Sequence, residues 1–485
     1  MDHAPHPRSH WLHEALALEQ PPDPVPLERH ERADVCIVGG GYTGLWTAIE
    51  LKTREPALDV VLIERDLCGS GASGRNAGYL LSWWAKFLSL RKICGEAEAL
   101  RIARASDAVV DEIAGFCATE GIDADLREDG WLWAAANAAQ RGAWQETVEA
   151  IGAHGLAPIV EWPAARAAGR CGAPGLAGGA FERHAARVQP ALLARGLRRV
   201  ALERGVRIHE RTPLVEVKAG VPAIVETPRG RIRAERVILA MNAWAVRWAG
   251  IRKAVMVVSG DMIVTPPVPE RLEVMGWRDA LTVSDGRTLL EYYRTTRDGR
   301  VAFGKGGMSG TFTYGGKVGA EVEGRSDFAE PLLAALHRTL PALAGVPAER
   351  SWRGPVDRSK DGLPFFGTLG RSPNVFFGVG FSGNGIGPCR LAGRILGSLA
   401  LETKDEWSTC PLVRAPTRDF PPEPFRLLGS RLIRRALLAK DRADDEGRRP
   451  SFVTRLAVSL APAGLSPFDG PVAQPAATPE ATTER

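Results

Sequence analysis

A glycine-rich turn near the start of the chain constrains the fold more than any other feature. An apolar run over residues 35–38 ends at Gly39, and further glycines follow at Gly41 and Gly44. This G-x-G-x-x-G spacing is typical of a turn that joins a strand to a helix. The first glycine permits the tight turn, the second lets backbone amides approach a pyrophosphate, and the third lets the helix lie close to the strand. A diphosphate would lie at the positive N-terminal end of that helix.

The residues around this turn complete a βαβ pattern. Residues 45–52 have a helical pattern, residues 60–63 form a second apolar run, and Glu64 follows directly. An acid at this distance from the turn binds a ribose hydroxyl, and its charge repels a 2′-phosphate. The sequence therefore predicts a domain that binds an adenine dinucleotide without a 2′-phosphate. A glycine turn that binds nothing is the alternative, and it is disfavoured because every part of the pattern occurs in register.

Composition and charge exclude several classes of protein. With 45% hydrophobic and 25% charged residues, the chain has the composition of an ordinary globular enzyme. Its net charge of +5 comes from scattered lysines and arginines, so no nucleic-acid-binding surface is expected. The seven cysteines include no C-x-x-C pair and the nine histidines form no ligand cluster, so we expect reduced thiols and no metal site. The chain shows neither a membrane-spanning apolar window nor a secretory signal, which predicts a cytoplasmic protein.

The predicted elements alternate between two kinds of structure. Helices are predicted over residues 96–120, 190–204, 328–340 and 388–401, by their apolar spacing. Between them, residues 250–330 are rich in predicted strands and include a hairpin. The predicted fold class is therefore mixed α/β: a Rossmann-type dinucleotide-binding domain with an inserted antiparallel β-sheet domain for the substrate.

The predicted domains are discontinuous in the sequence. They are a leader over 1–32, a dinucleotide-binding domain over 33–90, 150–245 and 346–405, a substrate domain over 91–149 and 246–345, a C-terminal helical extension over 406–469, and a disordered tail over 470–485. Within the extension, residues 425–440 form a basic amphipathic helix with Phe425, Leu428 and Leu432 on one stripe. Such a helix either docks on the body, which we favour, or contacts a membrane surface or a partner.

A second glycine-rich segment, residues 69–78, follows the βαβ unit. With it, the chain resembles the D-amino-acid-oxidase-like superfamily of FAD-dependent oxidoreductases, which includes glycine oxidase, sarcosine oxidase and γ-glutamylputrescine oxidase. Residues 212–214, 237–244 and 378–387 carry the same resemblance, which spans roughly residues 33–402. The sequences of residues 82–86 and 292–296 are most similar to those of a branch of aminophosphonate oxidoreductases.

The resemblance implies that FAD is the cofactor and that it is bound noncovalently. The cysteine that sarcosine oxidase bonds to its flavin would fall near residues 350–365, where this chain has none. The residues implied to contact FAD come from the two glycine-rich segments, the end of the second strand, the region near 214 and the turn near 380. They are Gly39, Gly41, Tyr42, Thr43, Gly44, Glu64, Arg65, Ser73, Gly74, Arg75, Asn76, Ala77, Gly78, Leu214, Gly380, Ser382, Gly383, Asn384, Gly385 and Ile386.

The resemblance also implies the reaction, the oxidation of a primary or secondary amine. A hydride passes from the carbon beside the nitrogen to flavin N5, and the resulting imine is hydrolysed. The substrate is a small-molecule amine, with aminophosphonates and amino acid derivatives included, and no strong catalytic base is expected because the flavin supplies the difficult chemistry. Val356 and Gly383 occupy two positions at which relatives carry an arginine for the substrate carboxylate. Amines or differently anchored anions are therefore expected rather than simple α-amino acids.

No catalytic residue is certain from the sequence, and Tyr293, Arg294 and Lys305 are the candidates. Tyr292 and Tyr293 are adjacent on a predicted strand, so alternation sends one toward the flavin, where an aromatic ring can pack on an ammonium group. Arg294, Lys305 and Arg358 are candidates to hold an anion. The structural alternatives are a core aromatic for the tyrosine and surface charges for the cations.

The electron acceptor stays open between O2 and another carrier. Sarcosine oxidases use a lysine for oxygen activation at the position of Ala302, and Lys305, three residues further along a strand, faces the other way. A dehydrogenase that passes electrons to a carrier is therefore an alternative to an oxidase. A flavin-binding protein without turnover is the alternative from another class.

Overall fold

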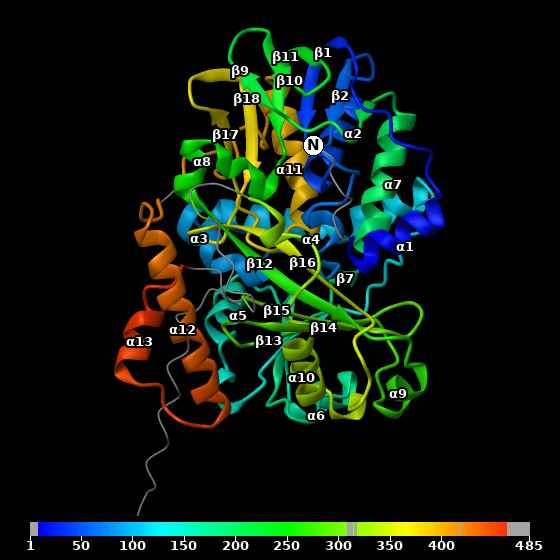
Figure 1. Cartoon of the computed structure of the whole chain (residues 1–485). Coiled ribbons are helices and arrows are strands. Elements are labelled where there is room, and N and C mark those ends of the chain that lie inside the picture. The colour runs from blue at the N-terminus through cyan, green and yellow to red at the C-terminus, as the bar shows by residue number, and fades with distance from the viewer. Residues whose placement is uncertain (1–7, 308–313, 315–317, 417–418, 463–485) are drawn as a thin grey trace, which may run out of the picture.

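A computed structural model describes residues 8–307, 314, 318–416 and 419–462. Two large sheets lie one above the other, with helices between them and on their outer faces (Figure 1). The C-terminal helices lie along one flank, on the left of this view. The mixed α/β fold class predicted from the sequence is confirmed, while the predicted disordered tail over 470–485 lies outside the described residues.

The first sheet carries the glycine-rich turn. Its strands follow the order β17-β18-β11-β1-β2-β8, parallel except for β17, and the hairpin β9–β10 extends β11. The strands are β1 (His30–Val38), β2 (Val60–Ile63), β8 (Arg207–His209), β9 (Glu216–Lys218), β10 (Ala223–Glu226), β11 (Arg231–Leu239), β17 (Phe365–Leu369) and β18 (Ser372–Val379). Val35 and Ile37 of β1 belong to one core and Cys36 and Val38 to another, because both faces of the sheet are covered.

Helices cover this sheet where the sequence predicts them. Helix α2 (Tyr42–Arg54) packs on α7 (Pro190–Glu203) and on α11 (Ile386–Ala400). The start of α7 is fixed by Pro190 in its first turn and by the side chain of Gln189, which accepts hydrogen bonds from the next two amides. Part of the predicted leader also docks, since α1 (His10–Glu19) lies against α7 and buries Trp11.

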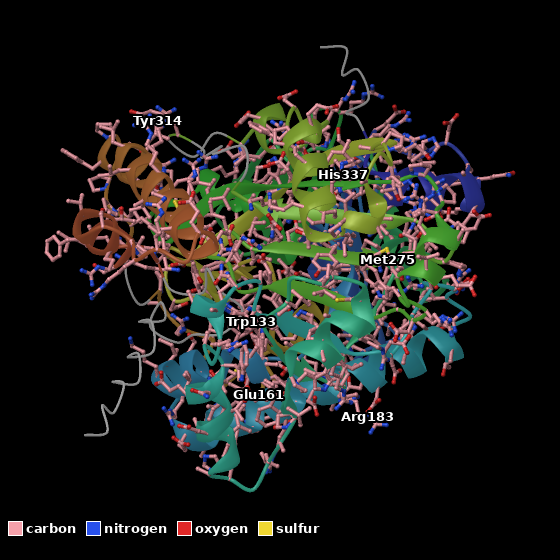
Figure 2. All side chains as sticks on the ribbon, turned by 90° about the horizontal axis from the view of Figure 1, so that it is seen from below. Trp133, Glu161, Arg183, Met275, Tyr314 and His337 are labelled. Atoms are coloured by element: carbon pink, nitrogen blue, oxygen red, sulfur yellow. The ribbon has the colours of Figure 1, made fainter. Side chains whose placement is uncertain are left out.

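The second sheet forms the lower layer. Its order is β16-β12-β15-β14-β13-β4-β6-β5, and neighbouring strands are antiparallel except β13 and β4. The strands are β4 (Trp131–Ala134), β5 (Ile159–Trp162), β6 (Gly179–Glu182), β12 (Val255–Val264), β13 (Thr282–Asp285), β14 (Glu291–Thr295), β15 (Val301–Gly306) and β16 (Arg350–Ser359). Its outer face packs on α6 (Ala164–Cys171), α9 (Pro269–Val274) and α10 (Ala329–Thr339). Figure 2 is seen from below, with His337 of α10 and Met275 beside α9 labelled.

The remaining elements connect or separate the two sheets. Helices α3 and α4 cross the middle of Figure 1, between the sheets. These elements are α3 (Phe87–Cys94), α4 (Glu96–Thr119), α5 (Gln145–Gly152), α8 (Ala249–Ala254), the strand pair β3 (Tyr79–Leu80) and β7 (Ala186–Arg187), and the 3-10 turns η1 (Ala72–Gly74), η2 (Trp84–Lys86), η3 (Ala138–Gln140), η4 (Asn242–Arg247), η5 (Ala320–Val322) and η6 (Pro341–Leu343).

The sheets divide the chain differently from the predicted domain boundaries at three places. Strands β5 and β6, predicted in the dinucleotide-binding domain, lie in the second sheet, and so does β16. Helix α4, predicted in the substrate domain, packs on α11 of the first layer. The reason is that strand pairing between distant segments, such as β4 with β13, is not encoded in local periodicity.

The predicted C-terminal helix exists as α12 (Phe425–Asp445), followed by α13 (Phe452–Val458). It docks on the flank of the second sheet, as the favoured alternative expects. The predicted apolar stripe nevertheless faces outward, with Phe425 68%, Leu428 58% and Leu432 63% exposed, while Leu437 on the opposite side is buried. Among the described helices we find none with the length and apolarity needed to cross a membrane.

Candidate active site

One large cavity of about 990 Å³ lies between the two sheets. Its wall begins at the carboxyl ends of β1 and β2, continues over β12 and β14 of the second sheet, and ends at α12. The carboxyl edge of parallel strands is where α/β proteins bind nucleotides. The cavity therefore joins the predicted dinucleotide site to the predicted substrate layer.

The geometry of the first glycine turn requires glycine. Gly39 has a φ of +114°, and a Cβ there would lie 2.4 Å from the carbonyl oxygen of Ala240. A Cβ on Gly44 would lie 2.0 Å from the carbonyl oxygen of Gly39, so only glycine lets α2 sit this close to β1. Gly41 is the N-cap of α2 and offers no side chain to the first-turn amides, so this helix N-terminus faces the cavity as an anion site.

Glu64 lines the cavity at the end of β2. Its carboxylate accepts hydrogen bonds from the amides of Gly40, at 2.8 Å, and Asp66, at 3.0 Å. Burial raises the pKa of Glu64, and these two amides act in the opposite direction. Arg65 beside it lies 4.0 Å from the ring centroid of Trp244, so this end of the cavity has an aromatic and cationic wall.

The second glycine-rich segment is a self-supporting loop. The guanidinium of Arg75 donates to the carbonyl of Ser70 at 2.8 Å, and the side-chain amide of Asn76 donates to the carbonyl of Ser73 at 2.9 Å. Ser73 also accepts the amide hydrogen of Tyr42 at 2.9 Å, which ties this loop to the start of α2. The loop therefore forms a preorganised strip of cavity wall.

The turn before α11 is held by a buried carboxylate. Asp357 accepts a hydrogen bond from the amide of Gly380 at 2.6 Å, and burial raises the pKa of Asp357 to about 6. Ser382 has a φ of +57°, an uncommon backbone conformation for a residue with a side chain. The turn and the N-terminus of α11 both line the cavity, and their backbone amides suit an electron-rich ring edge.

The structure places most of the predicted cofactor residues on the cavity wall. Those that do not line it are Gly44, Gly74, Gly78 and Gly380. Gly74 and Gly78 serve packing, because a Cβ on either would lie 2.2 Å from a backbone oxygen, that of Gly69 or Val188. Gly380 has a φ of +87° and shapes the turn that its neighbours present.

None of the three candidate catalytic residues lines the cavity. Tyr293 lies in the core beneath the second sheet, stacked on Phe303 at 6.0 Å, and strand alternation turns Tyr292 into the cavity instead. Lys305 forms an ion pair with Glu291 at 2.7 Å.

Arg294 is 1% exposed and donates to the carbonyl of Val188 at 2.8 Å, with its guanidinium 4.6 Å from the ring centroid of Trp11. Burial lowers the pKa of Arg294 to about 9. Arg294 therefore supports the 76–78 loop and the docked leader rather than a ligand. Arg358, the third anion candidate, does line the cavity, and burial lowers its pKa to about 10.

Several residues that line the cavity have no recognisable signal in the sequence. Trp244 of η4 belongs to a stretch already recognised as similar to relatives, but a 3-10 turn gave no local signal of its orientation. Ser259 and Gly260 of β12 carry no motif. Ile433 and Arg434 of α12 are part of a recognised amphipathic helix, yet amphipathicity does not reveal which cavity a docked helix closes.

The end of the cavity nearest the second sheet is aromatic and apolar. Tyr292 packs edge-on to Tyr79 at a centroid distance of 6.4 Å, and the hydroxyl of Tyr79 donates to the carbonyl of Tyr293 at 2.8 Å. Val356 and Gly383 also line the cavity. In the part of the chain that the structure describes, no group of three or more His, Cys, Asp or Glu side chains is arranged for a metal ion.

Comparison with known proteins decides the family. The family model described as FAD dependent oxidoreductase matches residues 34–399. The chain belongs to this FAD-dependent oxidoreductase family. FAD is therefore its cofactor, and the cavity fits that group, because the glycine turn, the 69–78 loop and the turn before α11 all line it.

Members of the FAD-dependent oxidoreductase family with known names resemble this chain over most of their length. Gamma-glutamylputrescine oxidoreductase of Escherichia coli strain K12 is 29% identical over 369 residues, which covers 76% of this chain and 83% of that protein. Glycine oxidase of Geobacillus kaustophilus is 25% identical, covering 78% of this chain and 96% of the relative. The crystal structure of the Geobacillus enzyme matches the fold with a TM-score of 0.64 and 23% identity, over 79% of this chain and 98% of that one.

Proposed function

We propose that this family member oxidises a small-molecule amine at the carbon beside the nitrogen, giving an imine that water hydrolyses. The observation that carries the proposal is the continuity of one cavity from the dinucleotide cradle at β1 and β2 to the aromatic wall at Tyr79 and Tyr292. Related proteins named for γ-glutamylputrescine and glycine support an amine or amino acid derivative. An aminophosphonate belongs to the same chemical class and stays within the proposal.

Different segments of the cavity wall suit chemically different parts of FAD. The N-terminus of α2 and the 69–78 loop suit the diphosphate, Glu64 suits the ribose, and the turn before α11 suits the flavin ring edge. Bound FAD supplies the acceptor for two electrons from the substrate. The chain supplies position and exclusion of water.

The proposed binding mode is noncovalent. Among the described residues that line the cavity, Cys389 is the only cysteine. Its Sγ lies 3.1 Å from the hydroxyl of Thr43, and burial raises the pKa of this thiol to about 12. The nucleophilic thiolate is therefore scarce at neutral pH.

No carboxylate on the described cavity wall is placed as a general base. Glu64 lies at the ribose end and Asp357 is engaged by the amide of Gly380. The substrate amine consequently has to enter as the neutral base, or lose its proton to solvent on binding. Before that proton is lost, Tyr79 and Tyr292 can orient the ammonium form by cation–π packing, an effect worth roughly 0.5–2 kcal/mol.

A dehydrogenase that passes electrons to a carrier other than O2 is the second candidate function. The observation that favours it is the environment of Ala302, which is fully buried at the position where sarcosine oxidases use lysine. Lys305 does not substitute, because it is paired with Glu291 on another side of the sheet.

Anaerobic reduction of the bound flavin tests the proposed function. The purified protein is mixed without oxygen with primary amines, secondary amines, amino acids and aminophosphonates while flavin absorbance is followed. Bleaching by at least one amine supports the proposal. Re-oxidation in air with stoichiometric peroxide indicates an oxidase, and re-oxidation only by a dye or quinone indicates a dehydrogenase. If no amine bleaches the flavin, the proposed function is wrong and the protein binds flavin without turnover.

A further inference from the structure

The exposed surface of α12 and α13 is rich in large apolar side chains. Of the fifteen such side chains that are exposed in the described part of the chain, seven lie on these two helices or directly after them. Each of the seven is more than half exposed, and they are Phe425, Leu428, Leu432, Phe452, Val453, Leu456 and Leu460. Single exposed apolar residues are ordinary, whereas a group of them on one pair of helices marks an interaction site.

The outward direction of the stripe on α12 is fixed by the way this helix docks. Near its start, the guanidinium of Arg426 donates to the carbonyl of Arg252 at 2.7 Å. Near its end, the carboxylate of Asp441 accepts the amide hydrogen of Thr288 at 3.2 Å. Leu437 is buried between these two anchors. Turning the exposed stripe inward would break all of these contacts, so the stripe is available to a partner.

Helix α13 packs beside α12 and extends the same surface. The two helices meet through the small apolar cluster that contains Ala436, Leu437 and Val458. Together they form one flank of the molecule, on the left of Figure 1. We call the exposed side chains of residues 425–460 the helix-pair face.

Arginines alternate with the apolar side chains on the helix-pair face. On α12, four residues follow the i, i+3, i+4, i+7 spacing and so share one side of the helix: Leu428, Arg431, Leu432 and Arg435. On α13, the same spacing groups three exposed residues: Phe452, Arg455 and Leu456. The helix-pair face is therefore both apolar and basic.

The positive charge of this face is not neutralised within the described residues. No ion pair there involves five exposed arginines, which are Arg431, Arg435, Arg442, Arg449 and Arg455. The neighbouring acids have other partners, which are Lys440 for Asp444, Arg287 for Asp445 and Arg448 for Glu446. The helix-pair face consequently carries an excess of positive charge.

An anionic lipid surface suits this combination better than a protein does. Apolar side chains enter the boundary between headgroups and acyl chains, while arginines contact the lipid phosphates. A two-fold contact with a second copy would bring the same arginines together. A protein partner would be expected to meet a polar rim, but Ser451 and Ser459 are the exposed neutral polar side chains among residues 425–460.

We propose that the helix-pair face binds the surface of a membrane that contains anionic phospholipids. The chain lies on the bilayer through this face, with its apolar side chains inserted and its arginines at the headgroups. Phe425 and Leu460 belong to this face and also line the cavity, so the membrane contact adjoins the cavity wall. The binding does not depend on the amine chemistry proposed above.

Cosedimentation of the FAD-loaded full chain with lipid vesicles tests the proposal. The vesicles contain phosphatidylcholine alone, or equal parts of phosphatidylcholine and phosphatidylglycerol, at low and at high salt. Two double variants remove one property each from the face: Leu428→Gln with Leu432→Gln, and Arg431→Gln with Arg435→Gln. The matched controls change exposed residues elsewhere: Val25→Gln with Val274→Gln, and Arg183→Gln with Arg278→Gln, where Arg183 is labelled in Figure 2.

We expect the wild-type protein to bind the anionic vesicles at low salt, to bind the neutral vesicles far more weakly, and to dissociate at high salt because the charges are screened. Each arginine near an anionic surface strengthens binding about fivefold, so either double variant should weaken binding roughly tenfold or more. Both controls should stay within about twofold of the wild type. All variants should keep their flavin absorbance and melting temperature, because the altered side chains are exposed.

Absence of binding to the anionic vesicles, equal binding to both kinds of vesicle, or full binding by both helix-pair variants would overturn the inference. Sedimentation velocity without lipid examines the other occupants. A dimer that the Leu428→Gln and Leu432→Gln variant dissociates would assign the face to a second copy instead. Vesicle binding that appears only after deletion of residues 463–485 would assign the face to that segment, and would equally overturn lipid binding by the full chain.

Discussion

At the scale of single residues, the cavity depends on a few buried acids and on strand alternation. Glu64 holds the amides of Gly40 and Asp66, and Asp357 holds the amide of Gly380. Each carboxylate thus fixes a glycine-containing segment at the cavity. Tyr292 and Tyr293 show how one step along a strand exchanges a cavity residue for a core residue.

Replacing Glu64 should weaken retention of FAD. Hydrogen bonds to a charged group contribute about 1.5–3 kcal/mol each, so loss of this carboxylate is expected to raise the dissociation constant of FAD by roughly tenfold or more. The measurement is the ratio of FAD to protein in Glu64→Ala and Glu64→Gln after gel filtration. Glu216→Ala, at an exposed position on β9, is the control and should keep full occupancy. Unchanged occupancy in both Glu64 variants would remove this residue from the site.

The adjacent tyrosines provide a paired prediction. Tyr292→Phe should change the rate or affinity of anaerobic flavin reduction about three- to tenfold, because a hydroxyl on the cavity wall is lost. Tyr293→Phe should change it less than twofold, because that ring packs in the core below the sheet. Stopped-flow bleaching with the best amine compares the two. The reverse order of effects would mean that β14 presents its other face to the substrate.

The buried carboxyl group of Glu182 should make the free energy of unfolding depend on pH. This side chain is 1% exposed, and burial raises its pKa to about 7, against the opposing effect of hydrogen bonding from Ser82. The folded state therefore binds the proton more tightly than the unfolded chain does. The stabilisation is complete below the unfolded-state pKa of about 4.5 and is lost as the pH rises to about 7, on the order of 3 kcal/mol in all.

The check is the melting temperature at pH 5 and pH 8 for the wild type, Glu182→Gln and Glu161→Gln. Glu161 lies exposed on the neighbouring strand β5 and is labelled in Figure 2. Glu182→Gln should lose less stability between the two pH values than the wild type, and Glu161→Gln should behave as the wild type. The same pH dependence in all three proteins would contradict the assignment to Glu182.

At the scale of elements, α12 packs on the body through a small hydrophobic cluster of its own. Leu437 is 3% exposed and packs with Leu289 and Val458 in a small separate cluster. Truncating a buried leucine costs about 2–5 kcal/mol, which is comparable with the stability of a single docked helix.

Leu437→Ala should therefore loosen α12 while the body stays folded. Hydrogen–deuterium exchange over residues 425–445 should rise, and the thermal transition of the body should shift little. Leu432→Ala, at a position 63% exposed on the same helix, should change neither. Equal exchange in both variants would show that the α12 dock does not depend on this cluster.

The elements also show what the sequence could predict. The βαβ start was predictable because glycine spacing, apolar runs and Glu64 are all local signals, and α4, α7 and α10 were predictable from apolar spacing. The order of the second sheet was not, because β4 pairs with β13 across 150 intervening positions or so, and local periodicity carries no record of such partners. The docked face of α12 was also hidden, because the strongest apolar stripe of that helix faces outward.

The candidate site residues also divide into those that local sequence signals predict and those that only tertiary packing determines. Glycines and the acid after β2 were predictable because backbone geometry demands them. Tyr293 and Lys305 lie off the cavity wall, which their spacing on the hairpin does not reveal, because the packing of α10 and the pairing with Glu291 decide the face.

At the scale of the whole molecule, the two sheets and α12 enclose one cavity with two chemical ends. Glycine-rich backbone, Glu64 and the Arg65–Trp244 pair line it at the first sheet, and the rings of Tyr79 and Tyr292 line it near the second sheet.

The central claim is that this cavity binds one FAD per chain. The most direct measurement is the visible spectrum of the purified protein, followed by release and quantification of the cofactor. We predict a yellow protein with flavin absorbance, one FAD per chain, and release by denaturation alone, as noncovalent binding requires. A colourless protein that takes up no FAD on reconstitution would contradict the claim.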